Sequence, residues 1–263
     1  MNAAIRSVVR TCAYLKIECV GIYRGYQGMI EGDFKPMDAR SVNNIINKGG
    51  TILKSARCDE FRTPQGRQLA YDQLVKEGIE ALVVIGGNGS FAGALVFNEE
   101  FNFPVMGIPG TIDYDILGSS FTIGFDTAIL IPEQNLGLER LLDSLKRSKK
   151  SGKSSSIVIV AEGDRIGKNV FELKEYVEEH LPIYDVRVSV LGHMQRGGNP
   201  TCFDRVLASR MVLKAVESLL EGKSNYMVGI RDNKLILTPI SEAIKAHTEI
   251  DEELIKVSDI MTT

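Results

Sequence analysis

Short runs of apolar residues alternate along the chain with stretches in which apolar residues recur every three or four positions. The short runs are rich in β-branched residues and bounded by Gly, Asn or charge, as buried strands of a parallel sheet are. They span Glu18–Tyr23, Ala81–Ile85, Val105–Ile108, Ile157–Ala161, Val186–Leu191 and Tyr226–Ile230. The helical pattern occupies Asn2–Leu15, Gln65–Glu77, Leu138–Ser148, Val170–Glu179 and Asp204–Leu220. This alternation predicts an α/β fold with doubly wound, mostly parallel sheets.

The composition is that of a globular protein without a strongly charged surface. Of the 263 residues, 44% are hydrophobic and 25% are charged, and the formal net charge is −3. Such a balance provides no excess of basic residues to attract nucleic acid or an anionic membrane. We therefore expect neither as a partner.

The cysteines and the N-terminal residues favour a cytoplasmic location. The four cysteines form no CxxC pair and match no zinc-ligand spacing, so we expect reduced thiols. Arg6 and Arg10 interrupt the only apolar stretch near the N-terminus, which argues against a signal peptide. No apolar run approaches the ~20 residues needed to span a bilayer.

Two features depart from a regular order of strands and helices. The chain opens on the helical pattern Asn2–Leu15, whereas in α/β folds the strand before the first helix usually carries a phosphate-binding turn. Further on, residues 126–128 read as the start of a helix and residues 129–132 as the end of a strand. The sequence therefore reads as two half-elements joined between Ala128 and Ile129.

The segment Val83–Ser90 (VVIGGNGS) has the composition of a phosphate-binding turn. It runs from a buried strand through glycines into a helix that begins near Ser90. Glycines let backbone amides approach phosphate oxygens, and the N-terminus of the helix adds a favourable dipole. Glycine turns at strand ends are also common without any ligand, so the segment alone leaves both interpretations open.

Two acids follow the next strand, in the segment Pro109–Asp115 (PGTIDYD). Open α/β sheets bind ligands at the carboxyl ends of their strands. One carboxylate could accept the proton of an attacking hydroxyl, and the other could lie near a metal-bound phosphate. The alternative interpretation is a turn with two solvated acids.

Two further segments carry basic residues that suit an anion. In Leu191–Gly198 (LGHMQRGG), His193 and Arg196 lie beside glycines, and arginine presents a planar fork to phosphate. Arg57 ends the run Gly49–Arg57 (GGTILKSAR) and could also reach a phosphate. Any one of these residues, taken alone, is more often structural or solvated.

Taken together and in this order, these segments resemble bacterial ATP-dependent 6-phosphofructokinases. The resemblance extends over essentially every residue and is carried by MNAAIR, GGTILKSAR, LVVIGGNGS, GIPGTIDYD, TIGFDTA, VLGHMQRGG and FDRVLASRM. It implies a phosphofructokinase-like two-domain fold in truncated form. It also implies a glycolytic kinase that transfers a phosphoryl group from MgATP to the 1-hydroxyl of fructose 6-phosphate, with Mg²⁺ as its metal.

The resemblance further implies roles for individual residues. Asp113 would accept the proton of the sugar hydroxyl, with Thr111 beside it at the transferred phosphoryl group. The implied ATP-binding residues are Arg57, Cys58, Gly87, Asn88, Gly89 and Ser90. The implied substrate-binding residues are Thr111, Ile112, Asp113, Glu162, Arg187, His193, Met194, Gln195 and Arg196. Arg187 would reach the sugar phosphate of a neighbouring subunit in a homotetramer, and an ADP effector site is implied at Arg6, Arg10 and Lys153.

Four positions bear on the phosphoryl donor and the metal. Gly89 and Gly110 favour ATP over pyrophosphate, because the pyrophosphate-using relatives carry side chains there that would crowd the α-phosphate of a nucleotide. Asn88 stands where the family has a magnesium-associated Asp, and an amide lacks the charge that a hard dication favours. Asp115 is the other metal-ligand candidate.

The resemblance also implies that a segment of the family pattern is missing between Ala128 and Ile129. This gap sets the expected domain organisation and leaves a second hypothesis open. We expect an ATP-binding domain over residues 1–128, a remnant of the sugar-phosphate and effector domain over 129–196, and a return to the first domain, with C-terminal helices, over 197–263. Loss of more than a βαβ unit at the junction, together with Asn88, would also suit a non-catalytic regulatory or binding paralogue of phosphofructokinase.

Overall fold

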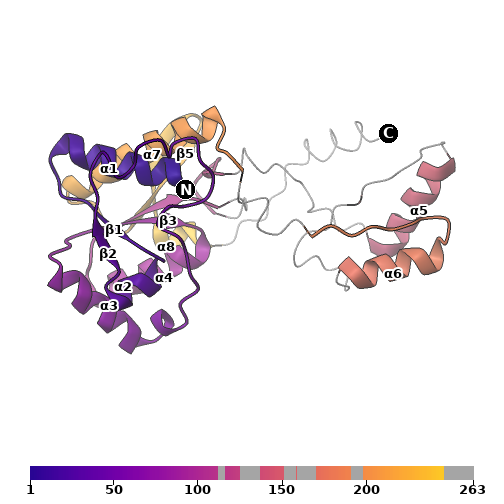
Figure 1. Ribbon diagram of the computed structural model, residues 1–263, viewed down its shortest axis with the longest axis horizontal. Coiled ribbons are helices and arrows are strands. Elements are labelled where there is room, and N and C mark those ends of the chain that lie inside the picture. The colour runs from indigo at the N-terminus through magenta and orange to yellow at the C-terminus, as the bar shows by residue number, and fades with distance from the viewer. Residues whose placement is uncertain (112–115, 125–136, 151–157, 159–169, 191–197, 246–263) are drawn as a thin grey trace. The chain divides into compact units, whose positions relative to one another are not determined.

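The computed structural model describes residues 1–111, 116–124, 137–150, 158, 170–190 and 198–245 (Figure 1). The chain divides into two compact units. The first combines Met1–Ala128 with His193–Thr248, and the second combines Ile129–Gly192 with Glu249–Thr263. Each unit is therefore made of two separate segments of the chain.

A four-stranded sheet lies at the centre of the first unit. Its strands, in spatial order, are β3 (Leu82–Gly86), β4 (Val105–Pro109), β5 (Tyr226–Arg231) and β6 (Lys234–Pro239). β3 and β5 run parallel to β4, and β6 forms an antiparallel hairpin with β5. The hairpin turn is tight because Asp232 and Asn233 take left-handed φ angles of 50° and 58°, as a type I′ turn requires.

Helices cover both faces of this sheet (Figure 1). They are α1 (Asn2–Leu15), α2 (Tyr26–Glu31), the 3-10 helix η1 (Glu60–Arg62), α3 (Pro64–Lys76), α4 (Asn88–Phe101), α7 (Cys202–Leu220) and α8 (Ile240–Ala243). Val105 of β4 packs with side chains of α3 and α4, whereas Met106 and Ile108 pack with those of α1 and α7. A sheet buried by helices on both faces confirms the predicted doubly wound α/β fold.

Two smaller structures complete the described chain. In the first unit, β1 (Val20–Ile22) and β2 (Phe34–Pro36) form a separate two-stranded antiparallel sheet. In the second unit, α5 (Gly137–Lys150) and α6 (Val170–His180) share a core of leucines and Val177. None of the helices in the described part of the chain has the length and hydrophobicity needed to cross a bilayer.

The helical pattern in the sequence located the helices well. The five predicted helices correspond to α1, α3, α5, α6 and α7, each with both ends within two residues of the prediction. The strands predicted at 18–23, 81–85, 105–108 and 226–230 are confirmed as β1, β3, β4 and β5.

One predicted strand is wrong. Residues 186–190 form no strand, and Val190 is 69% exposed. No neighbouring strand pairs with this segment in the described part of the second unit, and an apolar run without a partner forms no ladder. The strand predicted at 157–161 lies outside the described residues, apart from Val158.

Candidate active site

β3 ends in the glycine turn found in the sequence, and α4 starts from that turn. Gly87 is the N-cap of α4, and its carbonyl accepts a hydrogen bond from the amide of Phe91 over 3.1 Å. No side chain caps this end of the helix, and no acidic residue lies in its first turn. Because the first amides of a helix have no acceptor within the helix and the dipole is positive there, this end of α4 suits an anionic group such as phosphate.

Three glycines near the turn differ in what an added Cβ would contact. A Cβ at Gly86 would lie 2.4 Å from Oγ of Ser90, and a Cβ at Gly110 would lie 3.1 Å from Cγ2 of Ile85. A Cβ at Gly89 would meet no atom within 4 Å. Packing therefore accounts for Gly86 and constrains Gly110, whereas Gly89 adjoins open space in the described structure.

The segment after β4 lies directly against this turn. The amide of Gly110 donates to the carbonyl of Gly86 over 2.9 Å, and a Cβ on Gly87 would lie 3.4 Å from Cβ of Thr111. The carboxyl ends of two adjacent parallel strands thus bring the predicted residues Gly87 and Thr111 together, at the edge of the sheet where α/β proteins bind ligands.

A loop from residue 118 to residue 124 braces the segment after β4. Thr122, which is 1% exposed, donates from Oγ1 to the carbonyl of Thr111 over 2.7 Å. The amide of Gly124 donates to Oδ1 of Asp204 over 2.8 Å, and Asp204 is buried in the first turn of α7. Neither Thr122 nor Asp204 was predicted as a site residue, although both lie in the motifs TIGFDTA and FDRVLASRM.

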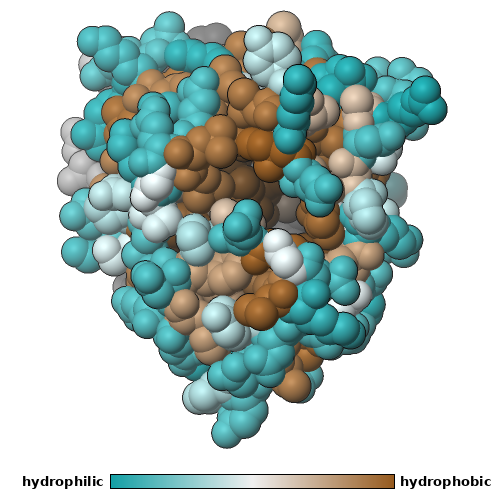
Figure 2. Space-filling view, turned by 90° about the vertical axis from the view of Figure 1, so that its left-hand side faces the viewer, coloured by the Kyte–Doolittle hydropathy of each residue, from teal (hydrophilic) through white to brown (hydrophobic). Residues whose placement is uncertain are grey.

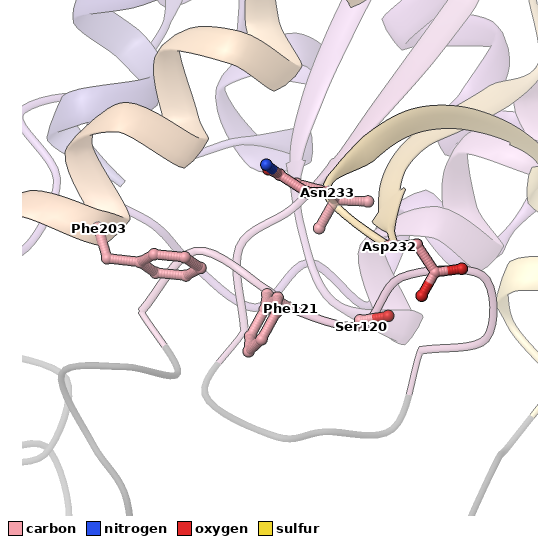
Figure 3. A pocket seen from close by; sticks show the side chains of 6 residues that line it. Ser120, Phe121, Phe203, Asp232 and Asn233 are labelled. Carbon is pink, nitrogen blue, oxygen red and sulfur yellow. The ribbon is translucent and has the colours of Figure 1, made fainter.

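The same loop forms one wall of a pocket of about 320 Å³ (Figure 3). Phe121 and Phe203 meet there edge to face, with ring centroids 5.1 Å apart. Ser120 fixes the loop to β5, because its amide donates to the carbonyl of Ile230 over 2.6 Å. The lining contains none of the predicted site residues.

Tyr26 supports the glycine turn from the other side. Its hydroxyl donates to the carbonyl of Ser90 over 2.5 Å, and its ring stacks on Phe61 with centroids 4.0 Å apart. Burial raises the pKa of Tyr26, so the hydroxyl keeps its proton and remains a donor. The sequence patterns gave no reason to single out this tyrosine, because its partners lie far away in the chain.

The 3-10 helix η1, which ends the loop that carries Arg57 and Cys58, is bonded to α4 through Arg67. The Arg67 guanidinium forms a two-pronged ion pair with the carboxylate of Glu100, at the far end of α4, and donates to the carbonyls of Phe61 and Arg62. This ion pair holds the pKa of Glu100 below its ordinary value. Within the loop, Arg57 is exposed and Cys58 packs against the aromatic core.

The structure describes only some of the other predicted residues. Arg6 and Arg10 lie on α1, where Arg10 donates to Oδ1 of Asn43 over 3.1 Å. Arg187 belongs to the second unit and lies exposed, 3.3 Å from a carboxylate oxygen of Asp185. The predicted residues outside the described ranges are Ile112, Asp113, Asp115, Lys153, Glu162, His193, Met194, Gln195 and Arg196.

A magnesium ion that binds together with a nucleotide needs few ligands from the protein. No group of three or more His, Cys, Asp or Glu side chains in the described part of the chain is placed to hold an ion. Mg²⁺ takes only one or two protein ligands when phosphates and water supply the rest. Asn88, which the sequence predicts as a metal ligand, is the first residue of α4.

Comparison with known proteins decides the family. The model of the phosphofructokinase family matches residues 1–130 and 127–219. The chain belongs to the phosphofructokinase family. It is 41% identical to "ATP-dependent 6-phosphofructokinase 2" of Bacteroides thetaiotaomicron, over 98% of this chain and 93% of the relative. It is 43% identical to "ATP-dependent 6-phosphofructokinase" of Halothermothrix orenii, over 100% of this chain and 95% of the relative.

A solved phosphofructokinase structure from Saccharomyces cerevisiae shares the fold. It matches with a TM-score of 0.81 and 28% identity, over 93% of this chain. This chain spans 43% of the length of the yeast chain.

The matches also support a shortened phosphofructokinase. The two parts of the family match meet at residues 127–130, where the sequence pattern predicts a junction of two half-elements. The alignment with the Bacteroides relative has 303 positions, whereas this chain has 263 residues, so at least 40 positions of the relative face a gap.

Proposed function

We propose that this phosphofructokinase transfers the terminal phosphoryl group of MgATP to the 1-hydroxyl of fructose 6-phosphate, giving fructose 1,6-bisphosphate. The observation that carries the proposal is the contact between the Gly86–Ser90 turn and the Gly110–Thr111 segment. The first suits the phosphates of ATP, and the second leads directly into the acids of the TIDYD motif. These substrates are metabolites of glycolysis, which is the basis for placing the protein in the cytoplasm.

Most residues of the site would bind the two substrates, and Asp113 would accept a proton. Arg57, Cys58 and the start of α4 hold ATP, while Glu162, His193 and Arg196 hold the sugar phosphate. Asp113 accepts the proton of the 1-hydroxyl as that oxygen attacks. Mg²⁺ neutralises phosphate charge when it is bound with ATP, with Asn88 and Asp115 as its candidate protein ligands.

The chain's two units suggest how these tasks are distributed. We assign ATP binding to residues 1–128 and 197–263, and part of the sugar-phosphate and effector binding to residues 129–196. The proposed role of Arg187 at a neighbouring sugar phosphate requires a homo-oligomer, a tetramer by family resemblance. ADP is the proposed effector, bound by Arg6, Arg10 and Lys153.

A coupled assay for fructose 1,6-bisphosphate tests the proposal. We expect turnover with MgATP that falls by ~10²–10⁴-fold in Asp113→Asn, since general bases contribute about that much. Glu80→Asn, which changes an exposed acid, is the control and should leave turnover unchanged. Binding of MgATP by the folded protein without any turnover would instead indicate the non-catalytic paralogue.

A further inference from the structure

Among the acids in the described part of the chain, Asp204 alone is buried. Hydrophilic side chains lie at the surface of the first unit, as Figure 2 shows for one of its sides, whereas Asp204 is 0% exposed. Burial of a charge lowers stability unless hydrogen bonds compensate. Asp204 has such a bond, because its Oδ1 accepts from the amide of Gly124 over 2.8 Å. The two residues lie 80 positions apart in the sequence, so this bond joins separate elements of the fold.

The position of Asp204 in α7 is one where an acid also favours the helix. Thr201, the N-cap, accepts a hydrogen bond from the amide of Asp204 over 3.2 Å. An acid at this place is stabilised by the first amides of its own helix. Its Oδ1 nevertheless reaches Gly124, whose φ of 108° is a backbone conformation that favours glycine. The helix start accounts for an acid here, and the contact with Gly124 gives the acid a second role.

Gly124 ends a loop whose middle is bonded to the segment at the end of β4. Oγ1 of Thr122 donates to the carbonyl of Thr111 over 2.7 Å. The amide of Ile123 donates to the carbonyl of Pro109 over 2.9 Å. Three successive residues of the loop therefore bond to Thr111, to Pro109 and to the buried acid of α7. A shift of that acid would reach Thr111 through one short run of backbone.

The start of α7 touches the same loop at a second point. Phe203, next to Asp204 in α7, meets Phe121 of the loop edge to face, with ring centroids 5.1 Å apart (Figure 3). On the other side of the acid, Arg205 donates to the carbonyl of Pro200 over 3.0 Å. The first turn of α7 thus contacts both the loop and the segment that precedes the helix. The LGHMQRGG motif, with its predicted sugar-phosphate ligands, comes shortly before that segment in the sequence.

We propose that Asp204 is a positioning residue for phosphoryl transfer, which holds Thr111 in place through the backbone of residues 122–124. The inference rests on the proposed function, in which Thr111 lies beside the transferred phosphoryl group. A carboxylate suits this task, because charge-assisted hydrogen bonds are shorter and stronger than neutral ones. Water does not compete for a fully buried carboxylate. Asp204 itself touches neither substrate and acts only through the position of Thr111.

Steady-state kinetics of two variants test this role. Asp204→Ala removes the acceptor, and kcat should fall by ~10²-fold, since a misplacement of about 1 Å costs that much. The KM for MgATP should change little, because the glycine turn after β3 keeps its residues. Asp204→Asn keeps an acceptor oxygen and should recover most of the loss. A kcat of folded Asp204→Ala equal to that of the parent overturns the proposal. If Asp204→Ala does not fold, Asp204→Ser takes its place, because its hydroxyl is shorter than the carboxylate.

A double variant separates positioning from general destabilisation. If Asp204 acts through the hydrogen bond between Thr122 and Thr111, then Asp204→Ala and Thr122→Val interrupt the same series of contacts. The double variant should therefore lose no more kcat than Asp204→Ala alone, whereas independent losses would multiply. Ser209→Ala, which removes an exposed hydroxyl from the same helix, is the control and should leave kcat unchanged. Losses that multiply in the double variant contradict the proposed route.

Hydrogen exchange tests the same contact without turnover. In the free protein, Asp204→Ala should speed exchange of the Ile123 amide by about tenfold, because the loop loses a bond that keeps it closed. The amide of Ser120, bonded to Ile230 over 2.6 Å at the other end of the loop, is the internal control and should not change. If the parent forms no product, the proposed function fails, and with it the catalytic role of Asp204. If the parent turns over and exchange at Ile123 is unchanged in Asp204→Ala, only the role of Asp204 is refuted.

Discussion

The hydroxyl of Thr122 donates a hydrogen bond of 2.7 Å to the carbonyl of Thr111, across a loop that begins and ends at the candidate active site. Thr122 is 1% exposed, so water does not replace this bond. The contact fixes the backbone at the residue proposed to lie beside the transferred phosphoryl group.

Thr122→Val should therefore lower both stability and turnover. The variant keeps the side-chain volume and removes this hydrogen bond to the partly buried carbonyl of Thr111, which costs ~1–3 kcal/mol of unfolding free energy. We expect kcat to fall more than KM changes, because phosphoryl transfer depends on positioning. Denaturant unfolding and steady-state kinetics measure the two effects. Thr122→Ser keeps the donor and should stay close to the parent; equal losses in both variants would contradict the role of the hydrogen bond.

Gly89→Asp should reduce the use of ATP without unfolding the protein. A Cβ at this position meets no atom within 4 Å, so a side chain is accommodated. The added carboxylate would then repel the phosphates near the start of α4. Turnover of the parent and the variant is measured with MgATP and with pyrophosphate at equal concentrations. The melting temperature of the variant should equal that of the parent. Faster reaction of the parent protein with pyrophosphate would refute the assignment of ATP as donor.

Asn88→Asp should raise turnover with MgATP. The carboxylate places charge near the proposed metal, and Mg²⁺ prefers charged oxygen ligands. Activity titrated against Mg²⁺ at fixed ATP should show a lower half-saturation point in the variant. The turnover of Asn88→Ala, whose side chain has no oxygen, should fall below that of the parent. If the folded Asn88→Asp variant turns over MgATP no faster than the parent, Asn88 does not limit the reaction.

The ion pair between Arg67 and Glu100 makes a prediction about pH. Because the pKa of Glu100 is lowered by its bonds to Arg67, the pair stabilises the fold above the ordinary carboxyl pKa of 4.5. This stabilisation is lost as the pH falls through the lower pKa of the folded state. Glu100→Gln should therefore melt below the parent at neutral pH, and the difference should shrink in acid. Glu80→Gln, at an exposed position, is the control and should show no such trend.

The recurrence of apolar residues every three or four positions located five helices, and two of these helices also carry a capping residue. Thr63 accepts a hydrogen bond from the amide of Gly66 at the start of α3, and Thr201 accepts one from Asp204 at the start of α7. Each cap lies two or three residues before the pattern that predicts its helix. The glycine turn after β3 is also a local signal, because its glycines stand together in the sequence.

Features that depend on distant partners could not be predicted in this way. β2 consists of Phe34, Lys35 and Pro36, which show no strand pattern and are ordered by pairing with β1. Tyr26 and Ser90 form a hydrogen bond although they lie 64 positions apart in the sequence. The predicted strand at 186–191 shows the converse, because a run with the right composition forms no strand without a neighbour to pair with.

The shortened chain should bind fructose 6-phosphate weakly while keeping its proton acceptor. Asp113 is retained, but at least 40 positions of the Bacteroides relative have no counterpart here, and by family resemblance the missing part supplies further sugar-phosphate ligands. Each hydrogen bond to a charged group contributes ~1.5–3 kcal/mol. Loss of two or three would weaken binding by several powers of ten, since ~1.4 kcal/mol is tenfold.

Calorimetric titration of the parent protein should therefore give a fructose 6-phosphate Kd in the millimolar range or no measurable heat. MgATP should still bind, because the turn at the start of α4 is intact. Light scattering on the same sample reports whether the oligomer that Arg187 needs has formed. Micromolar sugar-phosphate binding with robust turnover would mean that the remaining residues, or a neighbouring subunit, replace the missing ligands.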